Sequence, residues 1–285
     1  MYNYVPYTII IDGSYFLHRT FHAVPPQYNR KGVLTNAVYG TVNAIHRVLD
    51  RYNPEYLAVV FDHPAKTFRH ILSAAYKADR PPHPEELTIQ LGLIQDVLKA
   101  LGVPVVSIAG HEGDDLIGTL AFMAADNGQK VMILTGDKDI TQLVDNDIVI
   151  EDYFKNVRYD AEGVYCRFNV YPDQIADMLA LMGDKCDGIK GVTGIGAKGA
   201  AGLLGQYKTL DAVIENIPHM RGHTGRLLTA GLEDLALSRQ LTKIVTDLPI
   251  DYDLDKIRLR AADVLTLKQI YDELGFQNFY YYPRF

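Results

Sequence analysis

The sequence predicts an α/β protein in which a mostly parallel central sheet is covered by helices on both faces and is followed by a helical portion. Short apolar runs rich in β-branched residues alternate with segments of helical periodicity, which is typical of parallel sheets. The pattern changes near residue 165, where a glycine-rich and then helical stretch begins. The 285 residues, 48% of them hydrophobic and 22% charged, suffice for one large α/β domain with a smaller appendage.

Five runs are expected to form strands: Tyr7–Ile11, Tyr56–Phe61, Val103–Ile108, Lys130–Leu134 and Asp147–Ile150. Helical patterns separate most of them, at Ala37–Tyr52, Glu85–Leu101, Asp114–Asn127 and Asp139–Val144. Pro172–Leu181 reads as a further helix with proline in its first turn. We therefore expect an α/β body over residues 1–165 and a helical portion over residues 166–285.

The segment 76–84, YKADRPPHP, is rich in proline and lies between two predicted helices. Proline restricts both its own backbone and that of the residue before it, so this segment is not expected to be regular structure. It is predicted to be a projecting loop, part of an arch around residues 69–91.

Composition excludes several classes of protein. The only cysteines, Cys166 and Cys186, argue against a disulfide framework and against a zinc site of the usual spacing. No apolar run approaches the roughly 20 residues that span a bilayer, and Met1–Pro6 carries no basic residue of the kind that opens a signal peptide. We expect a soluble cytoplasmic protein with no membrane contact.

Acidic residues follow the predicted strands at the ends where ligands of open parallel sheets bind. Asp12 and Asp62 end the first two, and acidic groups follow the third and fourth. Two further acids open the glycine-rich segment and could fold back to join them. The full set is Asp12, Asp62, Glu112, Asp114, Asp115, Asp137, Asp139, Asp184 and Asp187.

Each acid taken singly could have a structural role, since Asp114 and Asp139 could cap helices and Asp62 could form a turn. Nine negative charges converging on one site would repel strongly unless cations held them together. Carboxylate oxygens favour hard divalent cations, and two Mg²⁺ ions about 4 Å apart are the usual arrangement for phosphodiester hydrolysis. The set therefore predicts two Mg²⁺ ions, for which Mn²⁺ could substitute.

The formal net charge of −7 at first argues against nucleic acid as a partner. Removing the nine acids leaves −7 + 9 = +2, so the rest of the chain is mildly basic. Basic residues flank the acids and suit a polyanion, although each could equally be solvated surface. They are Arg19, Lys66, Arg69, Lys77, Arg80, Lys185, Lys190 and Lys198.

The stretch Gly194–Gly199 matches the dinucleotide pattern G-x-G-x-x-G, but it follows a predicted helix instead of a strand, which excludes a dinucleotide fold. A hairpin between two helices over about residues 174–205 is the better interpretation. Its amides could hold a phosphate, and its turn carbonyls could hold a monovalent cation. Such contacts bind the backbone of DNA without reading its sequence. The alternative is a tight interhelical turn without a ligand.

These motifs together resemble the 5′-nucleases of the flap endonuclease superfamily, which include the 5′→3′ exonuclease domain of bacterial DNA polymerase I and its stand-alone bacterial and phage relatives. The resemblance covers residues 8 to 204 in the family's order. The motifs are IIIDGSYFLHRTFHA, VVFDHPAKTFRH, YKADRPPHPEEL, GHEGDDLIGTLA, LTGDKDITQLV and LMGDKCDGIKGVTGIGAKGAAGLL. The resemblance implies a PIN-like α/β body and a helix–three-turn–helix motif that grips duplex DNA.

The resemblance also assigns roles to residues. The first metal site would be served by Asp12, Asp62, Glu112, Asp114 and Asp115, and the second by Asp137, Asp139, Asp184 and Asp187. Lys77 and Arg80 match catalytic cations of the arch that contact the scissile phosphate. The remaining DNA contacts would come from Arg19, Arg69, Tyr76, Gly191, Gly194, Gly196 and Lys198, with a K⁺ ion at the helix–three-turn–helix in some relatives.

The function expected from this pattern is hydrolysis of DNA at 5′ flaps, branch points and 5′ ends during replication or repair, in a bacterial or phage-infected cell. RNA primers on DNA and a separate DNA polymerase are the other expected partners, and a monomer is the expected state. Two alternatives are a catalytically silent protein that binds branched DNA, and a PIN-type ribonuclease. The first predicts missing metal ligands, and the second a shorter chain without the hairpin.

Overall fold

A six-stranded sheet with the order β3-β2-β1-β4-β5-β6 forms the centre of the computed structural model, which describes residues 7–276. Its neighbours pair in parallel except β5 and β6, which are antiparallel. The strands are β1 (Tyr7–Asp12), β2 (Leu57–Val60), β3 (Val105–Val106), β4 (Lys130–Leu134), β5 (Ile148–Asp152) and β6 (Val157–Tyr159). The stretch Met1–Pro6, on which the signal-peptide expectation rests, lies outside the described residues.

Both faces of the sheet are buried, as the apolar strands predict. Along β1, Ile9 and Ile11 enter the hydrophobic cluster on one face, and Ile10 enters the cluster on the other. The four residues of β2 are all buried. Because side chains alternate along a strand, one segment contributes residues to the hydrophobic clusters on both faces of the sheet.

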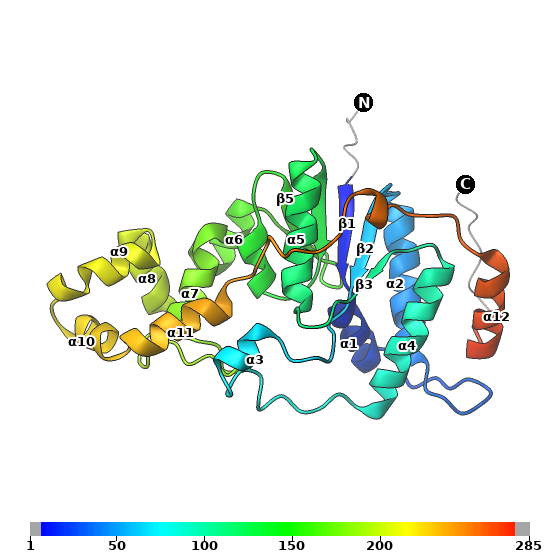
Figure 1. Ribbon diagram of the computed structural model, residues 1–285, viewed down its shortest axis with the longest axis horizontal. Coiled ribbons are helices and arrows are strands. Elements are labelled where there is room, and N and C mark those ends of the chain that lie inside the picture. The colour runs from blue at the N-terminus through cyan, green and yellow to red at the C-terminus, as the bar shows by residue number, and fades with distance from the viewer. Residues whose placement is uncertain (1–6, 277–285) are drawn as a thin grey trace.

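Helices cover the two faces of the sheet (Figure 1). One face carries α1 (Gly13–Ala23), α2 (Asn36–Tyr52) and α4 (Glu85–Ala100), whose apolar residues belong to the same cluster as Ile9. The other face carries α5 (Gly113–Asp126), η1 (Asp139–Leu143) and α6 (Ala161–Phe168). This arrangement is the predicted α/β body.

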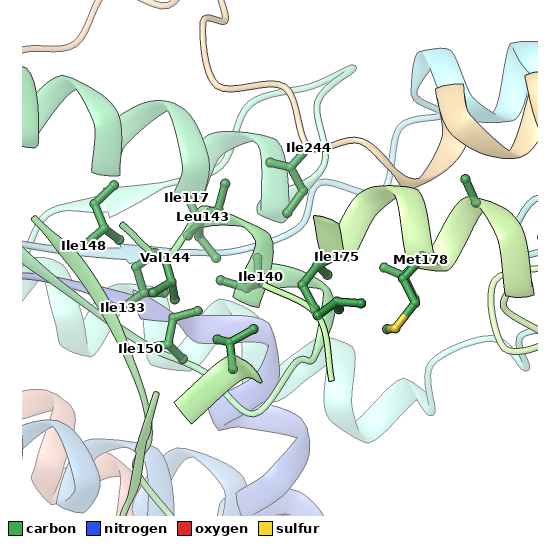
Figure 2. Packing of buried hydrophobic residues seen from close by; sticks show 14 of the residues in the cluster. Ile117, Ile133, Ile140, Leu143, Val144, Ile148, Ile150, Ile175, Met178 and Ile244 are labelled. Carbon is green, nitrogen blue, oxygen red and sulfur yellow. The ribbon is translucent and has the colours of Figure 1, made fainter. Parts of the chain in front are cut away.

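A helical lobe extends from one end of the sheet (Figure 1). It consists of η2 (Pro172–Gln174), α7 (Ile175–Met182), α8 (Ala197–Tyr207), α9 (Leu210–Asn216), η3 (Ile217–His219), α10 (His223–Ala230) and α11 (Leu232–Thr242). Figure 2 shows Ile175 of α7 beside Ile140 of η1, Met178 further along α7, and Ile244 near Ile117 and Leu143. The lobe and the body therefore share one hydrophobic core.

The chain after the lobe departs from the prediction, which was helix to the C-terminus. Residues 243–263 contain only the short η4 (Asp255–Ile257) and run back across the body (Figure 1). The amides of Leu259 and Arg260 donate to the carbonyls of Glu55 and Gly102, both at 3.0 Å. The last described helix, α12 (Val264–Leu274), then packs beside α4.

Other predicted elements differ in detail. The expected strand at Val103–Ile108 shrinks to β3, where Pro104 removes a donor next to the ladder. The expected helix after Asp139 is a 3₁₀ helix, and α1 and β6 were not predicted. In the arch, α3 (Phe68–Leu72) is followed by non-helical residues 73–84 that lead to α4, in agreement with the prolines of this segment.

Candidate active site

A cleft of about 740 Å³ lies at the carboxyl ends of the parallel strands, between the body, the arch and the start of the lobe. Seven of the nine predicted metal ligands line it: Asp12, Asp62, Asp114, Asp137, Asp139, Asp184 and Asp187. They come from five separate segments of the chain. The predicted arch cations Lys77 and Arg80 line the same cleft.

The acids that follow β1 and β2 are fixed by backbone amides. Asp12 is the N-cap of α1, and its Oδ1 accepts from the Tyr15 amide at 2.8 Å. Its Oδ2 accepts from Thr135 Oγ1 at 2.7 Å. Asp62 Oδ1 accepts from the Gly113 amide at the start of α5, also at 2.8 Å. Helix N-termini thus hold both carboxylates at the edge of the sheet.

The acids after β4 and in the lobe are held in a different way. Asp137 Oδ1 accepts from the Asp139 amide at 2.8 Å, whereas Asp139 Oδ1 is buried and has no hydrogen-bond partner. Asp184 Oδ2 accepts from Lys138 Nζ at 2.5 Å. A buried carboxylate oxygen without a partner is costly, which indicates that Asp139 is arranged for a ligand.

The turn at residues 184–189 docks against the arch. Lys77, whose φ is +53°, donates its amide to the Asp187 carbonyl at 2.9 Å. Arg80 Nη2 donates to Asp187 Oδ1 at 2.5 Å. Gly188 has a φ of +66°, and a Cβ there would lie 2.1 Å from the Ala75 carbonyl oxygen. Glycine is therefore required at the point where the arch and the turn meet.

Burial and mutual repulsion raise the pKa of several cleft acids. Burial raises the pKa of Asp12 to about 7, and the charges of Asp62 and Asp137 act in the same direction. Burial also raises the pKa of Asp139 to about 7, reinforced by Asp137. The pKa of Asp114 is raised well above its ordinary value, mainly by burial and then by Asp137. Such crowding of carboxylates makes the cleft ready to bind cations.

Two acids have lowered pKa values because a lysine neutralises each. Burial acts to raise the pKa of Glu112, but the charges of Lys77 and Arg69 outweigh it. Burial likewise opposes the lowered pKa of Asp184, which the hydrogen bond and charge of Lys138 produce. Glu112 does not line the cleft itself; its oxygens accept from Thr67 Oγ1 at 3.1 Å and from Lys77 Nζ at 3.1 Å.

Three predicted site residues do not line the cleft and are held by buried contacts instead. Asp115 has no exposed surface and forms a two-pronged ion pair with Arg69, at 2.6 and 2.8 Å, so neither faces the cleft. Tyr76 is 4% exposed and its hydroxyl donates to Glu112 Oε2 at 2.9 Å, so its ring cannot stack on a base in this conformation.

Of the other predicted DNA contacts, one is buried and the rest are exposed. Gly191 is buried, with a φ of +63°, and its amide donates to Ser238 Oγ at 3.0 Å, so this amide is not available to a phosphate. Gly194, Gly196 and Lys198 are exposed. Gly196 is the N-cap of α8, whose first amides receive no side-chain cap. Arg19 is exposed on α1, next to His18 of the cleft.

Two family models together match most of the chain. Residues 7–169 match the 5′-3′ exonuclease N-terminal resolvase-like domain, and residues 170–264 match the 5′-3′ exonuclease C-terminal SAM fold. The chain belongs to the 5′-3′ exonuclease family. It is therefore a nuclease by family, and the predicted resemblance and α/β fold are confirmed.

Relatives of this 5′-3′ exonuclease family member agree with that assignment. A 5′-3′ exonuclease of Aquifex aeolicus is 38% identical over 269 residues, which are 94% of this chain and 92% of that protein. DNA polymerase I of Pseudomonas aeruginosa is 40% identical over 278 residues, which are 95% of this chain but only 30% of the polymerase. The chain thus spans about a third of the polymerases that it matches.

Solved structures share the fold. T5 5′-exonuclease with bound divalent zinc ions superimposes with a TM-score of 0.73 at 22% identity, covering 94% of this chain and 99% of that one. The catalytic core of Rad2 in complex with DNA substrate gives 0.64 at 16% identity, covering 96% and 88%. Within residues 7–276, no helix is long and apolar enough to cross a membrane.

The donor set of this exonuclease fits a hard divalent cation. Its cleft presents carboxylate oxygens, one of which, Asp139 Oδ1, is buried without a partner. Among the described residues, no three His, Cys, Asp or Glu side chains already converge to hold a metal ion. Instead, Lys77 and Lys138 place positive charge on Glu112 and Asp184. Cation binding would require these ammonium groups to move away from Glu112 and Asp184.

Sequence reasoning missed several residues that line the cleft, among them Tyr15, His18, His83, Lys138 and Arg167. Lys138 could have been noticed, because it stands between two predicted ligands. The His18 and His83 rings lie 4.8 Å apart across α1 and the arch, a contact between segments that no local pattern shows.

Proposed function

We propose that this protein hydrolyses phosphodiester bonds of DNA at 5′ flaps and branch points and from 5′ ends, by a two-metal mechanism. The observation that carries the proposal is the cleft itself. Seven carboxylates line it, together with the arch cations Lys77 and Arg80. A phosphodiester that bridges bound cations and an arch of positive charge has its charge balanced on both sides.

Two Mg²⁺ ions held by the cleft acids, or Mn²⁺ in their place, would supply the Lewis acidity that lowers the pKa of water and neutralises charge on the phosphate. The first group would comprise Asp12, Asp62, Asp114 and the nearby Glu112. The second would comprise Asp137, Asp139, Asp184 and Asp187. We expect products with a 5′-phosphate and a 3′-hydroxyl.

Lys77 and Arg80 would orient the scissile phosphate. In the structure both are paired with acids: Lys77 Nζ lies 3.1 Å from Glu112 Oε2, and Arg80 Nη2 lies 2.5 Å from Asp187 Oδ1. When divalent cations neutralise these carboxylates, the two side chains become free to bind phosphate oxygens. Removal of one preorganised donor that stabilises charge in a transition state typically costs about 10²- to 10³-fold in rate.

The start of α8 would hold the duplex without reading its sequence. Gly196 and Lys198 are exposed there, and the uncapped amides of the helix N-terminus suit a phosphate. A K⁺ ion at the neighbouring turn carbonyls belongs to the same helix–three-turn–helix proposal. The arch would select a free single-stranded 5′ end, since its residues 73–84 pass beside the cleft.

The biological role that we propose is removal of flaps and primers during replication or repair, including RNA primers on DNA. A separate DNA polymerase is a partner consistent with the polymerase I relatives. We propose that the protein acts as a cytoplasmic monomer.

The test is cleavage of an end-labelled 5′-flap DNA with Mg²⁺ and with EDTA, beside the Asp137→Asn variant. We expect Mg²⁺-dependent cutting near the branch, and in the variant a loss of at least about 10³-fold in rate with flap binding largely retained. Cleavage at the normal rate by Asp137→Asn would remove Asp137 from the mechanism. Tight binding without cutting by the unchanged protein would instead support a silent branched-DNA binder.

A further inference from the structure

We propose that Arg69, Asp115 and Gln142 are positioning residues. They fix residues 241–245, the segment that leaves the helical lobe, against both acidic motifs of the cleft. By holding the lobe in one register, they would set which phosphate of the DNA meets the cleft. The second part of this inference rests on the proposed nuclease function.

The Arg69–Asp115 pair holds the segment from one side. Arg69 is 2% exposed, and besides its two bonds to Asp115 it donates Nε to the Leu241 carbonyl at 3.0 Å and Nη2 to the Lys243 carbonyl at 2.7 Å. Asp115 Oδ1 also accepts from the Val245 amide at 2.9 Å. One buried pair thus joins α3, α5 and the chain that follows α11.

Gln142 holds the segment from the other side. Its Nε2 donates to the Thr242 carbonyl at 3.1 Å, and its Oε1 accepts from the Ile244 amide at 3.0 Å. The same Nε2 donates to the Asp139 carbonyl at 3.0 Å. The residue therefore ties the segment directly to the backbone of a cleft acid.

Together the three side chains bond the backbone of every residue from 241 to 245, one group each. A segment outside regular structure needs such partners when it is buried. Two of these partners come from the acidic motifs of the cleft. Asp115 follows Asp114 directly, and Gln142 lies three residues after Asp139. A shift of the lobe would therefore move both groups of acids.

This arrangement also accounts for an acid that cannot bind a cation from the cleft. Both oxygens of Asp115 are occupied, and the side chain has no exposed surface. Apolar residues often stabilise a core as well as a buried ion pair does. A polar network, by contrast, has defined partners and fixes one packing register, which is the property that a positioning role requires.

The experiment compares Asp115→Asn and Gln142→Leu with two controls. Gln240→Leu changes an exposed glutamine of α11 that lies one residue before the segment, and Asp114→Asn removes a cleft acid. Binding of Mn²⁺ is counted by electron paramagnetic resonance, without any substrate. We expect Asp115→Asn and Gln142→Leu to bind as many Mn²⁺ ions as the unchanged protein, and Asp114→Asn to bind fewer. Loss of a Mn²⁺ ion in Asp115→Asn would make Asp115 a ligand and overturn the inference.

Two further measurements test positioning. Amide exchange at Ile244 and Val245 should become at least about tenfold faster in both variants, and not in Gln240→Leu. Gln142→Leu removes the acceptor of the Ile244 amide, and Asp115→Asn breaks the ion pair with Arg69 that holds the acceptor of the Val245 amide in place. On an end-labelled flap, the cuts should spread over neighbouring phosphates instead of falling at one. Faster exchange with an unchanged cut pattern in both variants would show that the segment does not set the register.

A measurement without DNA separates this inference from the nuclease proposal. With Cys166 and Cys186 changed to serine, spin labels at exposed Arg226→Cys in the lobe and Lys99→Cys in the body report their distance distribution. Gln142→Leu should broaden that distribution, and Gln240→Leu should not. If the unchanged protein fails to cut DNA, the nuclease proposal falls, while an unbroadened distribution in Gln142→Leu would overturn the positioning role on its own.

Discussion

Four acids in and beside the cleft differ in their electrostatic surroundings, although all lie at the same edge of the sheet. Asp12 and Asp139 have pKa values raised to about 7, first by burial and then by their acidic neighbours. Glu112 and Asp184 are also buried, yet lysines lower their pKa values. The two pairs of acids differ because positively charged side chains lie next to Glu112 and Asp184. Near neutral pH, Asp12 and Asp139 therefore hold either a proton or a metal cation.

This difference predicts how stability depends on pH. In EDTA, the free energy of unfolding should fall as pH rises from about 4 to about 7, because the folded protein keeps protons on Asp12 and Asp139 that the unfolded chain releases. Above pH 7, Mg²⁺ should restore stability, by about 2.7 kcal/mol at a hundred times its Kd. Thermal melts at pH 5 and pH 8 measure this.

The matched variant is Asp12→Asn, which cannot ionise. It should flatten the decline in EDTA and lose much of the gain from Mg²⁺. A decline as steep as that of the unchanged protein would show that Asp12 does not titrate in this window.

The acids at the strand ends could be predicted because parallel pairing carries the carboxyl ends of neighbouring strands to one edge, whatever the loops do. The burial of Arg69 and Gly191 could not be predicted from the sequence. Arg69 is buried by carbonyls more than 170 residues away, at Leu241 and Lys243, and Gly191 by Ser238 of α11. A basic residue beside a motif gives no sign of whether it faces solvent or such a partner.

At the scale of elements, the cleft depends on contact between the arch and the turn at residues 184–189. The part of the arch that makes the contact, residues 73–84, is neither helix nor strand, and its backbone meets that of the turn at Gly188. The prolines of the arch predicted its irregular course. Its contact with the turn could not be predicted, because it depends on how α3 and α7 are placed.

Gly188→Ala should therefore weaken this contact. Its φ of +66° disfavours a side chain, and the added Cβ would lie 2.1 Å from the Ala75 carbonyl. We expect a loss of roughly 1–3 kcal/mol of unfolding free energy and a reduced rate of cleavage. The control is Gly202→Ala on α8, where no atom lies within 4 Å and helix propensity should add about 0.5–1 kcal/mol. Equal effects of the two substitutions on chemical denaturation would contradict this account.

At the scale of the whole molecule, the chain leaves the body, forms the lobe and returns to the far side of the sheet (Figure 1). The helix α12 then adds Leu267, Tyr271 and Leu274 to the core that contains α2 and α4. A helix was expected in this region as part of the helical portion, but nothing local indicated that it would pack on the body instead of the lobe. The returning segment makes the stability of the body depend on residues after the lobe.

Leu267→Ala tests that dependence. The side chain is 2% exposed in the core, so its truncation should cost about 2–5 kcal/mol of unfolding free energy. Leu265→Ala, two residues earlier and 77% exposed, should change it by less than about 0.5 kcal/mol. Denaturant titrations of the two variants give the comparison, and similar losses would mean that α12 is not anchored through Leu267.

The cleft acids are proposed to hold two divalent cations, and anomalous diffraction from crystals soaked in Mn²⁺ would locate these ions. We predict two peaks about 4 Å apart within the cleft, one toward Asp12, Asp62 and Asp114 and the other toward Asp137, Asp139 and Asp187. Crystals of Asp139→Asn should lose the second peak. Peaks located away from these carboxylates, or none at a saturating Mn²⁺ concentration, would show that the cleft does not hold the cations.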